Sequence, residues 1–116
     1  MKTLFILNDA AYGSERSYNG LRLAHTLVQR EHEAVHIFLI GDAVTCAVRG
    51  QKTPDGYYNI ERMVRAITQR GGKVGCCGSC SDARGLTDDT RVEGAHHSSM
   101  EELAAWTLWA DKVITF

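Results

Sequence analysis

The sequence has little of what marks several broad classes of protein. Its 116 residues include a single proline and no low-complexity tract, internal repeat or interdomain linker. No apolar run approaches the ~20 residues of a membrane-spanning helix, and the four apolar residues near the amino terminus are too few for a secretory signal. We therefore expect one globular domain over residues 1–116, located in the cytoplasm and outside any membrane.

An excess of charge of one sign is also missing. Thirteen basic and fourteen acidic residues give a net charge of -1, without the clustered Lys and Arg that nucleic-acid binding needs. Neither G-x-G-x-x-G nor G-x-x-x-x-G-K-[ST] occurs, so no motif supports a nucleotide site. With 44% apolar and 23% charged residues, the composition is that of an ordinary globular domain, and we expect no nucleic-acid partner.

What the chain does have is a cluster of cysteines. Of its four cysteines, Cys76, Cys77 and Cys80 fall within five positions, and Cys46 lies apart. In a reducing compartment, such a cluster is more often reactive or metal-binding than a disulfide framework. The cluster is the most informative feature of the sequence.

Apolar runs alternate with helical patterns along the whole chain. We expect strands over residues 4–7, 35–40, 73–77, 91–95 and 112–116. Helices are predicted over residues 14–30, 42–48, 59–70 and 98–110, begun by Ser14 or Gly13, by Asp42, by Asn59 and by a Ser98–Glu101 capping box. The best-defined strands are continuously apolar, which is typical of a parallel sheet covered by helices on both faces. The predicted fold class is therefore α/β.

The cysteine cluster carries the chemistry that the sequence predicts. Cys77 is expected where a strand ends and a helical turn over residues 79–84 begins. The backbone N–H groups at that point, with a cationic Arg84 nearby, favour thiolate over thiol. A thiolate can attack a sulfane sulfur or a disulfide, and Cys80, one turn further on, is spaced to resolve an oxidised or persulfidated Cys77. We therefore predict Cys77 and Cys80 as the catalytic residues.

Three loops are expected beyond the carboxyl ends of the strands, where parallel sheets gather their ligand and catalytic groups. They cover residues 9–13, 41–46 and 77–85. Five of their residues are candidates to line a crevice at the thiols: Asp9, Tyr12, Gly13, Cys46 and Arg84. The alternatives are that the first loop is only a turn, and that Cys46 is a small apolar core residue.

Other residues leave further alternatives open. Cys76 is expected to point away from Cys77, because strand side chains alternate between faces. A zinc site would combine the cluster with His96 or His97, but structural zinc sites usually use two separated pairs, so we expect no metal and no cofactor. The remaining aromatic and histidine candidates are assigned to the surface or a helix face (His25, His32 and His36) and to the core or a subunit interface (Trp106 and Trp109).

Several strings together resemble the DsrE-like sulfur-relay family, in particular its YchN-type members. They cover nearly the whole chain: Asn8-Asp9 with Tyr12-Gly13, Gly41-Asp42-Ala43-Val44 with Cys46-Ala47, Gly50 to Asn59, Cys77-Gly78-Ser79-Cys80 with Asp82-Ala83-Arg84-Gly85, and Met100 to Ala104.

The resemblance implies a three-layer α/β/α fold with a mostly parallel sheet of about five strands. It also implies a homo-oligomer, trimeric or hexameric, that works with sulfur donor and acceptor proteins, and a persulfide-carrying cysteine at the position of Cys77. Cys80 matches a second cysteine of the YchN-type pattern. The predicted function is a cytosolic sulfur carrier. The alternatives are a dithiol redox protein that uses Cys77 and Cys80, and a non-enzymatic oligomeric binding subunit.

Overall fold

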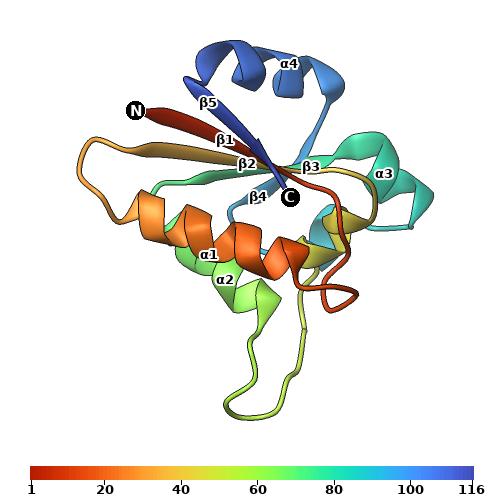
Figure 1. The fold of residues 1–116 in the computed structure, drawn as a ribbon. Coiled ribbons are helices and arrows are strands. Elements are labelled where there is room, and N and C mark those ends of the chain that lie inside the picture. Colours follow the sequence, from red (N-terminus) through yellow and green to blue (C-terminus); the bar gives the residue numbers. More distant parts are fainter.

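A five-stranded sheet forms the middle layer of the computed structural model, which describes residues 1–116 (Figure 1). Its strands are β1 (Lys2–Leu7), β2 (Ala34–Leu39), β3 (Lys73–Cys77), β4 (Ala95–Ser98) and β5 (Lys112–Thr115). They are ordered β4-β3-β2-β1-β5, and every neighbouring pair is parallel. The predicted α/β class and parallel sheet are confirmed.

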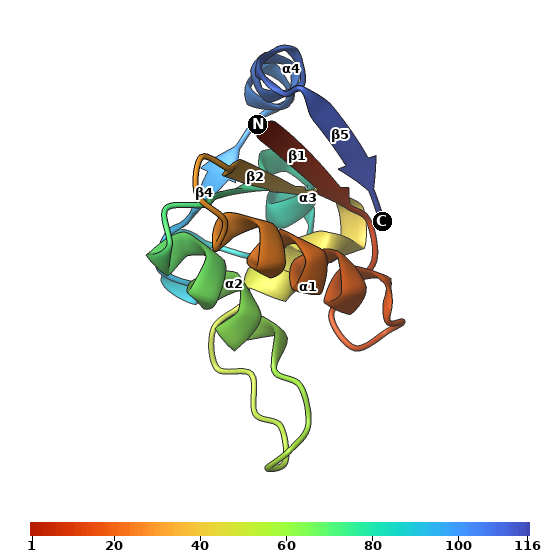
Figure 2. The same cartoon turned by 60° about the vertical axis from the view of Figure 1, so that its left-hand side comes forward.

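Helices cover both faces of the sheet (Figures 1 and 2). Helices α1 (Arg16–Val28) and α2 (Ile60–Gln69) lie on one face, and α4 (Met100–Trp109) lies on the other. The 3-10 helices η1 (Gly41–Ala47) and η2 (Asp88–Thr90) and the short helix α3 (Gly78–Ala83) fill the remaining connections. None of these helices has the length and apolar character to cross a bilayer.

The core lies along the central strands. In β2, every residue from Val35 to Leu39 is buried, because helices cover the sheet on both sides. Phe5, Leu7 and Phe38 have no exposed surface. Each such side chain contributes about 1.5–3 kcal/mol through burial, so the central strands hold the carboxyl edge of the sheet in a fixed position.

Two predicted boundaries were wrong by a few residues. The fourth strand is Ala95–Ser98 instead of residues 91–95, so His96 and His97 lie on an edge strand. The cap of α4 is Ser99, whose hydroxyl accepts a hydrogen bond from the Glu102 N–H. Ser98 ends β4, and its hydroxyl donates to the Glu102 carboxylate at 2.6 Å. Pairing with β3 overrides the local capping signal here.

Two predicted caps are also absent. Helix α1 begins after Glu15, without a side-chain cap. The Ser14 hydroxyl donates to Asp9 instead. The segment after β2 forms a 3-10 helix that has no side-chain cap, and the Asp42 carboxylate pairs with Arg84 at 2.6 Å instead. The predicted Asn59 cap of α2 is confirmed by its bond from the Arg62 N–H at 3.1 Å.

The assignment of His36 to the surface was wrong. His36 lies on β2 under α4, with 8% of its surface exposed. Its ring stacks on Trp109 at 3.7 Å and contacts Trp106 at 4.5 Å. Both tryptophans therefore pack inward against the sheet, as the core alternative predicted.

Candidate functional site

Strand β3 delivers Cys77 to the carboxyl edge of the sheet, where α3 begins at once (Figure 1). Gly78 makes the immediate turn possible. A Cβ atom at this position would lie 2.5 Å from His97 Cε1 and 2.6 Å from the Ser98 carbonyl oxygen, so only glycine fits against β4. The buried Ser81 hydroxyl donates to the Cys77 carbonyl at 2.8 Å and fixes the first turn of α3.

The Cys77 sulfur collects hydrogen bonds from the start of α3. The Cys80 N–H donates to Cys77 Sγ at 3.4 Å, and the Ser79 hydroxyl lies 3.5 Å from the same atom. Cys77 exposes 7% of its surface, while Cys46 exposes none and Cys76 1%. Of these three thiols, only Cys77 combines polar contacts with an opening to solvent.

These contacts favour the ionised form of Cys77. Burial alone would raise its pKa. The Cys80 thiol, the Ser79 hydroxyl and the N–H groups of both residues donate to the sulfur and outweigh burial, so the pKa of Cys77 is lowered from its ordinary value. The arrangement can hold a thiolate and can stabilise the same thiolate when it leaves.

Cys80 lies beside Cys77 but has the opposite tendency. Burial and its hydrogen bond to the Cys77 sulfur raise the pKa of the Cys80 thiol. The Gly41 N–H donates to Cys80 Sγ at 3.2 Å and ties α3 to the loop after β2. The predicted pair is therefore brought together, with the pKa of Cys77 lowered and the pKa of Cys80 raised.

Arg84 is near this pair but acts on Cys80. Its guanidinium donates to the Cys80 carbonyl at 3.0 Å and pairs with Asp42 at 2.6 Å. Its charge opposes the rise of the Cys80 pKa and is no cause of the shift at Cys77. The predicted stabilisation of the thiolate thus comes from hydrogen bonds and not from this cation.

Cys46 and Cys76 are core residues. Burial raises the pKa of Cys46 to about 12, and its thiol donates to the Asp9 carbonyl at 3.7 Å. Burial also raises the pKa of Cys76 to about 11, although the nearby Arg91 opposes the shift. The structure therefore gives Cys46 the apolar role that was its alternative. Arg91 acts on Cys76, whereas Ser79 and Cys80 act on Cys77, which is consistent with the expected alternation of the two side chains.

The first loop contacts α1, η1 and the start of α2, and none of its hydrogen bonds reaches the Cys77 sulfur. The Asp9 carboxylate accepts a 2.5 Å hydrogen bond from Ser14, and its carbonyl accepts one from Ser17 at 2.6 Å. Tyr12 donates to Gln51 at 2.6 Å and accepts from the Ile60 N–H at 3.0 Å. Gly13 makes one long backbone contact, to the Ala10 carbonyl at 3.5 Å.

The histidines do not join the cysteines in a metal-binding arrangement. His96 pairs with Glu102, and His97 Nε2 lies 3.1 Å from Asp82. No group of three or more His, Cys, Asp or Glu side chains is placed to hold a metal ion. The zinc alternative thus has no geometric support.

Sequence reasoning missed three contributors: Ser79, Gly41 and Gly78. Ser79 was detectable, because a hydroxyl two residues after a thiolate at a helix start is within reach of it. Gly41 donates across 39 residues of sequence, and the need for glycine at position 78 depends on the register of β4. Neither leaves a local sequence signal.

The fold and the site define a class of protein: an α/β domain with a hydrogen-bonded thiol at the carboxyl edge of a parallel sheet. Comparison with known proteins identifies the family. The chain belongs to the DsrE/DsrF-like family, whose model matches residues 1–116. It is 42% identical to Protein YchN of Escherichia coli strain K12 over 116 residues, 99% of this chain and 98% of that protein. The crystal structure of YchN from E. coli superposes with a TM-score of 0.94 and covers 100% of this chain and 99% of that chain.

More distant relatives carry a functional name. Sulfurtransferase TusD of Salmonella arizonae is 25% identical over 128 residues, with 100% of both chains covered. A structure from Methanobacterium thermoautotrophicum, 14% identical, shares the fold with a TM-score of 0.77, covering 99% of this chain and 98% of that chain. The chain is thus a member of a family of sulfur-relay type.

Proposed function

We propose that the protein is a cytosolic sulfur carrier that accepts sulfane sulfur as a persulfide on Cys77 and passes it to a partner thiol. The observation that carries the proposal is the set of hydrogen bonds to Cys77 Sγ from the Cys80 N–H and the Ser79 side chain. They lower the pKa of Cys77, which favours the thiolate form that attacks sulfane sulfur. Membership of the family and the sulfurtransferase name of a distant relative point to the same chemistry.

The transfer balances without an external oxidant. The Cys77 thiolate attacks the outer sulfur of a donor persulfide, a new S–S bond forms, and the donor's own S–S bond breaks to release its thiolate. An acceptor thiolate then attacks the terminal sulfur on Cys77, and Cys77 leaves as the thiolate. The N–H and hydroxyl groups that stabilise the resting thiolate also stabilise it as the leaving group.

Intact-mass measurement tests the proposal. After incubation with sodium polysulfide, we expect an adduct of one sulfur atom on the wild-type protein and a strongly diminished one on Cys77→Ser, because the pKa of the remaining Cys80 thiol is raised. Cys76→Ser is the matched control and keeps the adduct, because the Cys76 thiol is 1% exposed and protonated. A wild-type protein without the adduct, or a Cys77→Ser protein that carries it undiminished, refutes the proposal.

A dithiol redox cycle is the second candidate, favoured by the position of the two cysteines at the start of α3, where the Cys80 N–H donates to Cys77 Sγ at 3.4 Å. Oxidation would join the two sulfurs and pass two electrons and two protons to an oxidant such as glutathione disulfide. A reversible loss of two hydrogen masses in wild type, absent in Cys80→Ala, supports this cycle. If titration with glutathione gives the same thiol count in Cys80→Ala and wild type, the cycle is ruled out.

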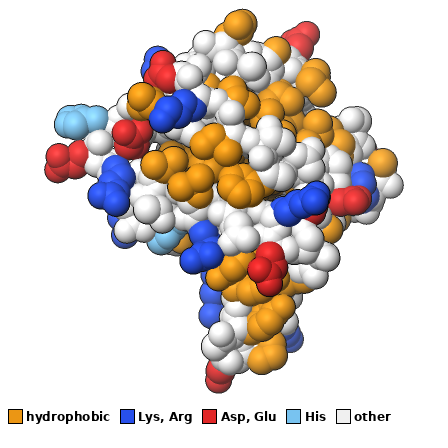
Figure 3. All heavy atoms as spheres, viewed as in Figure 1, with side chains coloured by type: hydrophobic (Ala, Val, Ile, Leu, Met, Phe, Trp, Pro, Cys, Tyr) orange, Lys and Arg blue, Asp and Glu red, His pale blue; other side chains and the backbone are white.

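The proposed carrier works as a homo-oligomer, trimeric or hexameric, together with donor and acceptor proteins. Support comes from exposed apolar side chains on α4 and β5: Leu108 is 88% exposed, Met100 62% and Val113 44%. Figure 3 shows apolar side chains at the surface in the region of α4. Apolar surface of this kind is typical of subunit contacts. Sedimentation of the purified protein tests the assembly, and a monomer at micromolar concentration would contradict it.

A further inference from the structure

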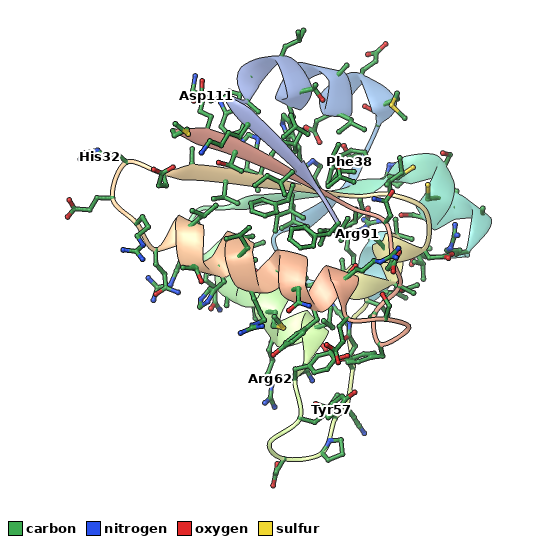
Figure 4. All side chains as sticks on the ribbon, in the orientation of Figure 1. His32, Phe38, Tyr57, Arg62, Arg91 and Asp111 are labelled. Carbon is green, nitrogen blue, oxygen red and sulfur yellow. The ribbon has the colours of Figure 1, made fainter.

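The largest cavity of the molecule lies away from the thiols, in a groove between α1 and α2. It measures about 490 Å³, within the range of small-molecule sites. Helix α1 contributes Arg22 and His25, and α2 contributes Arg62 and Met63. Tyr57 and Tyr58 close one end, where the projecting segment of residues 50–59 joins α2 (Figures 1 and 4).

The charge of the groove is of one sign. No acidic residue lines it. Neither Arg22 nor Arg62 has a carboxylate within 4 Å, whereas Arg16, Arg65, Arg84 and Arg91 are all paired. The Arg22 guanidinium contacts only neutral groups, the Asn19 amide oxygen at 3.1 Å and the Tyr18 ring at 5.4 Å. Two guanidinium groups thus face one groove with donors free for an anion.

The tyrosines supply an aromatic surface beside these charges. Tyr58 stacks on Tyr18 at 4.2 Å, on Tyr57 at 4.6 Å and on Tyr12 at 5.6 Å. Tyr12 is fixed by its bonds to Gln51 and to the Ile60 N–H. Tyr57 nevertheless exposes 54% of its surface. The stack therefore presents a pre-ordered ring face to solvent at the edge of a cationic groove.

The geometry points to a second binding site: the groove between α1 and α2 holds a small molecule in which a flat aromatic ring carries a phosphate or carboxylate group. The ring packs against Tyr57 and Tyr58, and the anion is bound by Arg22 and Arg62. In Figure 4, the side chains of Tyr57 and Arg62 project from the same region below α1. Figure 3 shows basic side chains bordering the apolar ones there.

This site is separate from the sulfur chemistry. None of the four cysteines lines the groove. Its ligand therefore adds a binding function to the carrier, and binding does not require Cys77. Tyr12, which sequence reasoning places at the thiols, belongs to the support of this groove.

Ligand titration followed by amide chemical shifts tests the site, with 5′-AMP, phenyl phosphate and 1-naphthoate as probes. We expect at least one probe to bind with a submillimolar dissociation constant and to shift groove residues. For AMP, adenosine and inorganic phosphate are the separated halves, and each is expected to bind roughly tenfold more weakly or worse. Binding should weaken as salt rises, because the arginines are exposed.

Paired variants locate the site. Arg22→Gln with Arg62→Gln should weaken binding roughly tenfold or more, and Tyr57→Ala should weaken it as well. Arg30→Gln with Arg70→Gln removes the same charge beside the ends of the same helices but outside the groove, and should leave binding unchanged. Cys77→Ser should also bind normally, whatever its sulfur chemistry.

Two results overturn the proposal. One is that none of the three probes shifts groove residues at millimolar concentration. The other is that substitution of either arginine pair weakens binding equally, which would show that binding depends on net charge alone. Thermal unfolding midpoints of the exposed-residue variants should equal that of wild type, so a loss of binding would not reflect misfolding.

Discussion

Replacing Gly78 by alanine should disturb both the fold and the thiol. The added Cβ would lie 2.6 Å from the Ser98 carbonyl oxygen, and that oxygen belongs to a strand of the sheet. Either α3 moves outward or β4 shifts, because an atom cannot remain so close to backbone. Overpacking of this kind costs about 1–3 kcal/mol, which lowers Tm by about 4–12 °C at roughly 4 °C per kcal/mol for a chain of this length.

The same displacement should weaken the site. If α3 moves, the Cys80 N–H and the Ser79 hydroxyl retreat from Cys77 Sγ, and the pKa of Cys77 rises towards its ordinary value. Denaturant unfolding measures the first effect, and the pH dependence of iodoacetamide alkylation measures the second. Gly13→Ala is the matched control, because its Cβ would meet Ala10 at an ordinary 3.8 Å.

A double variant separates the two contacts at position 78. His97→Ala removes the side chain that the new Cβ would meet at 2.5 Å but leaves the Ser98 carbonyl in place. In the His97→Ala background, Gly78→Ala should therefore still lower the free energy of unfolding by at least half as much as it does in wild type. An effect of Gly78→Ala below about 0.5 kcal/mol in wild type, within the range of ordinary surface changes, would refute the packing of α3 against β4.

Two further predictions concern the other thiols and His36. Native protein at pH 8 should react with iodoacetamide only at Cys77 and Cys80. Cys46 and Cys76 should react only after denaturation, because burial raises their pKa values to about 12 and about 11. Peptide mapping that finds Cys46 or Cys76 modified in the native protein would contradict this. Burial, with help from Lys73, lowers the pKa of His36 to about 4. The folded protein therefore resists protonation of His36, so the stability that the neutral ring provides is complete above pH 6.5 and is lost as the pH falls towards 4. After allowance for solvent screening, the loss is about 2 kcal/mol at pH 4.5. Urea unfolding at pH 7 and pH 4.5 measures the fall in the free energy of unfolding between the two pH values. This fall should be about 2 kcal/mol smaller in His36→Gln than in wild type. An equal fall in both proteins would be evidence against the burial of a neutral imidazole.

The sequence was a good guide to the fold where local and global signals agree. The apolar run of β2 and the Asn59 cap of α2 were both predicted, since each depends on neighbouring residues alone. The failures come from long-range pairing. Ser98 has capping-box spacing, but its alignment with Cys77 on β3 makes it the end of a strand. His36 is polar, yet Trp106 and Trp109 cover it from a helix some 70 residues later.

The candidate site was predictable in its centre and not in its surroundings. Strand alternation and a helix start are local features, and they single out Cys77 over Cys76. The position of the Arg84 guanidinium depends on Asp42, which is 42 residues away in sequence. No local sequence feature therefore indicates that Arg84 acts on Cys80 and not on Cys77. The tyrosine stack joins residues from the first loop, α1 and the projecting segment, and no spacing rule connects these positions.

Cys76 and Cys77 are adjacent in sequence, and burial acts in the same direction on both thiols, yet their pKa values shift in opposite directions. Clustering of cysteines therefore does not by itself create a reactive thiol here. The difference arises because the chain leaves the strand at Cys77, with φ -47 and ψ 121, and turns directly into α3. That turn brings the Cys80 N–H and the Ser79 hydroxyl to one sulfur and leaves its neighbour in the core. The chemistry of the site is thus set by where β3 ends, and Gly78 is the residue that permits it to end there.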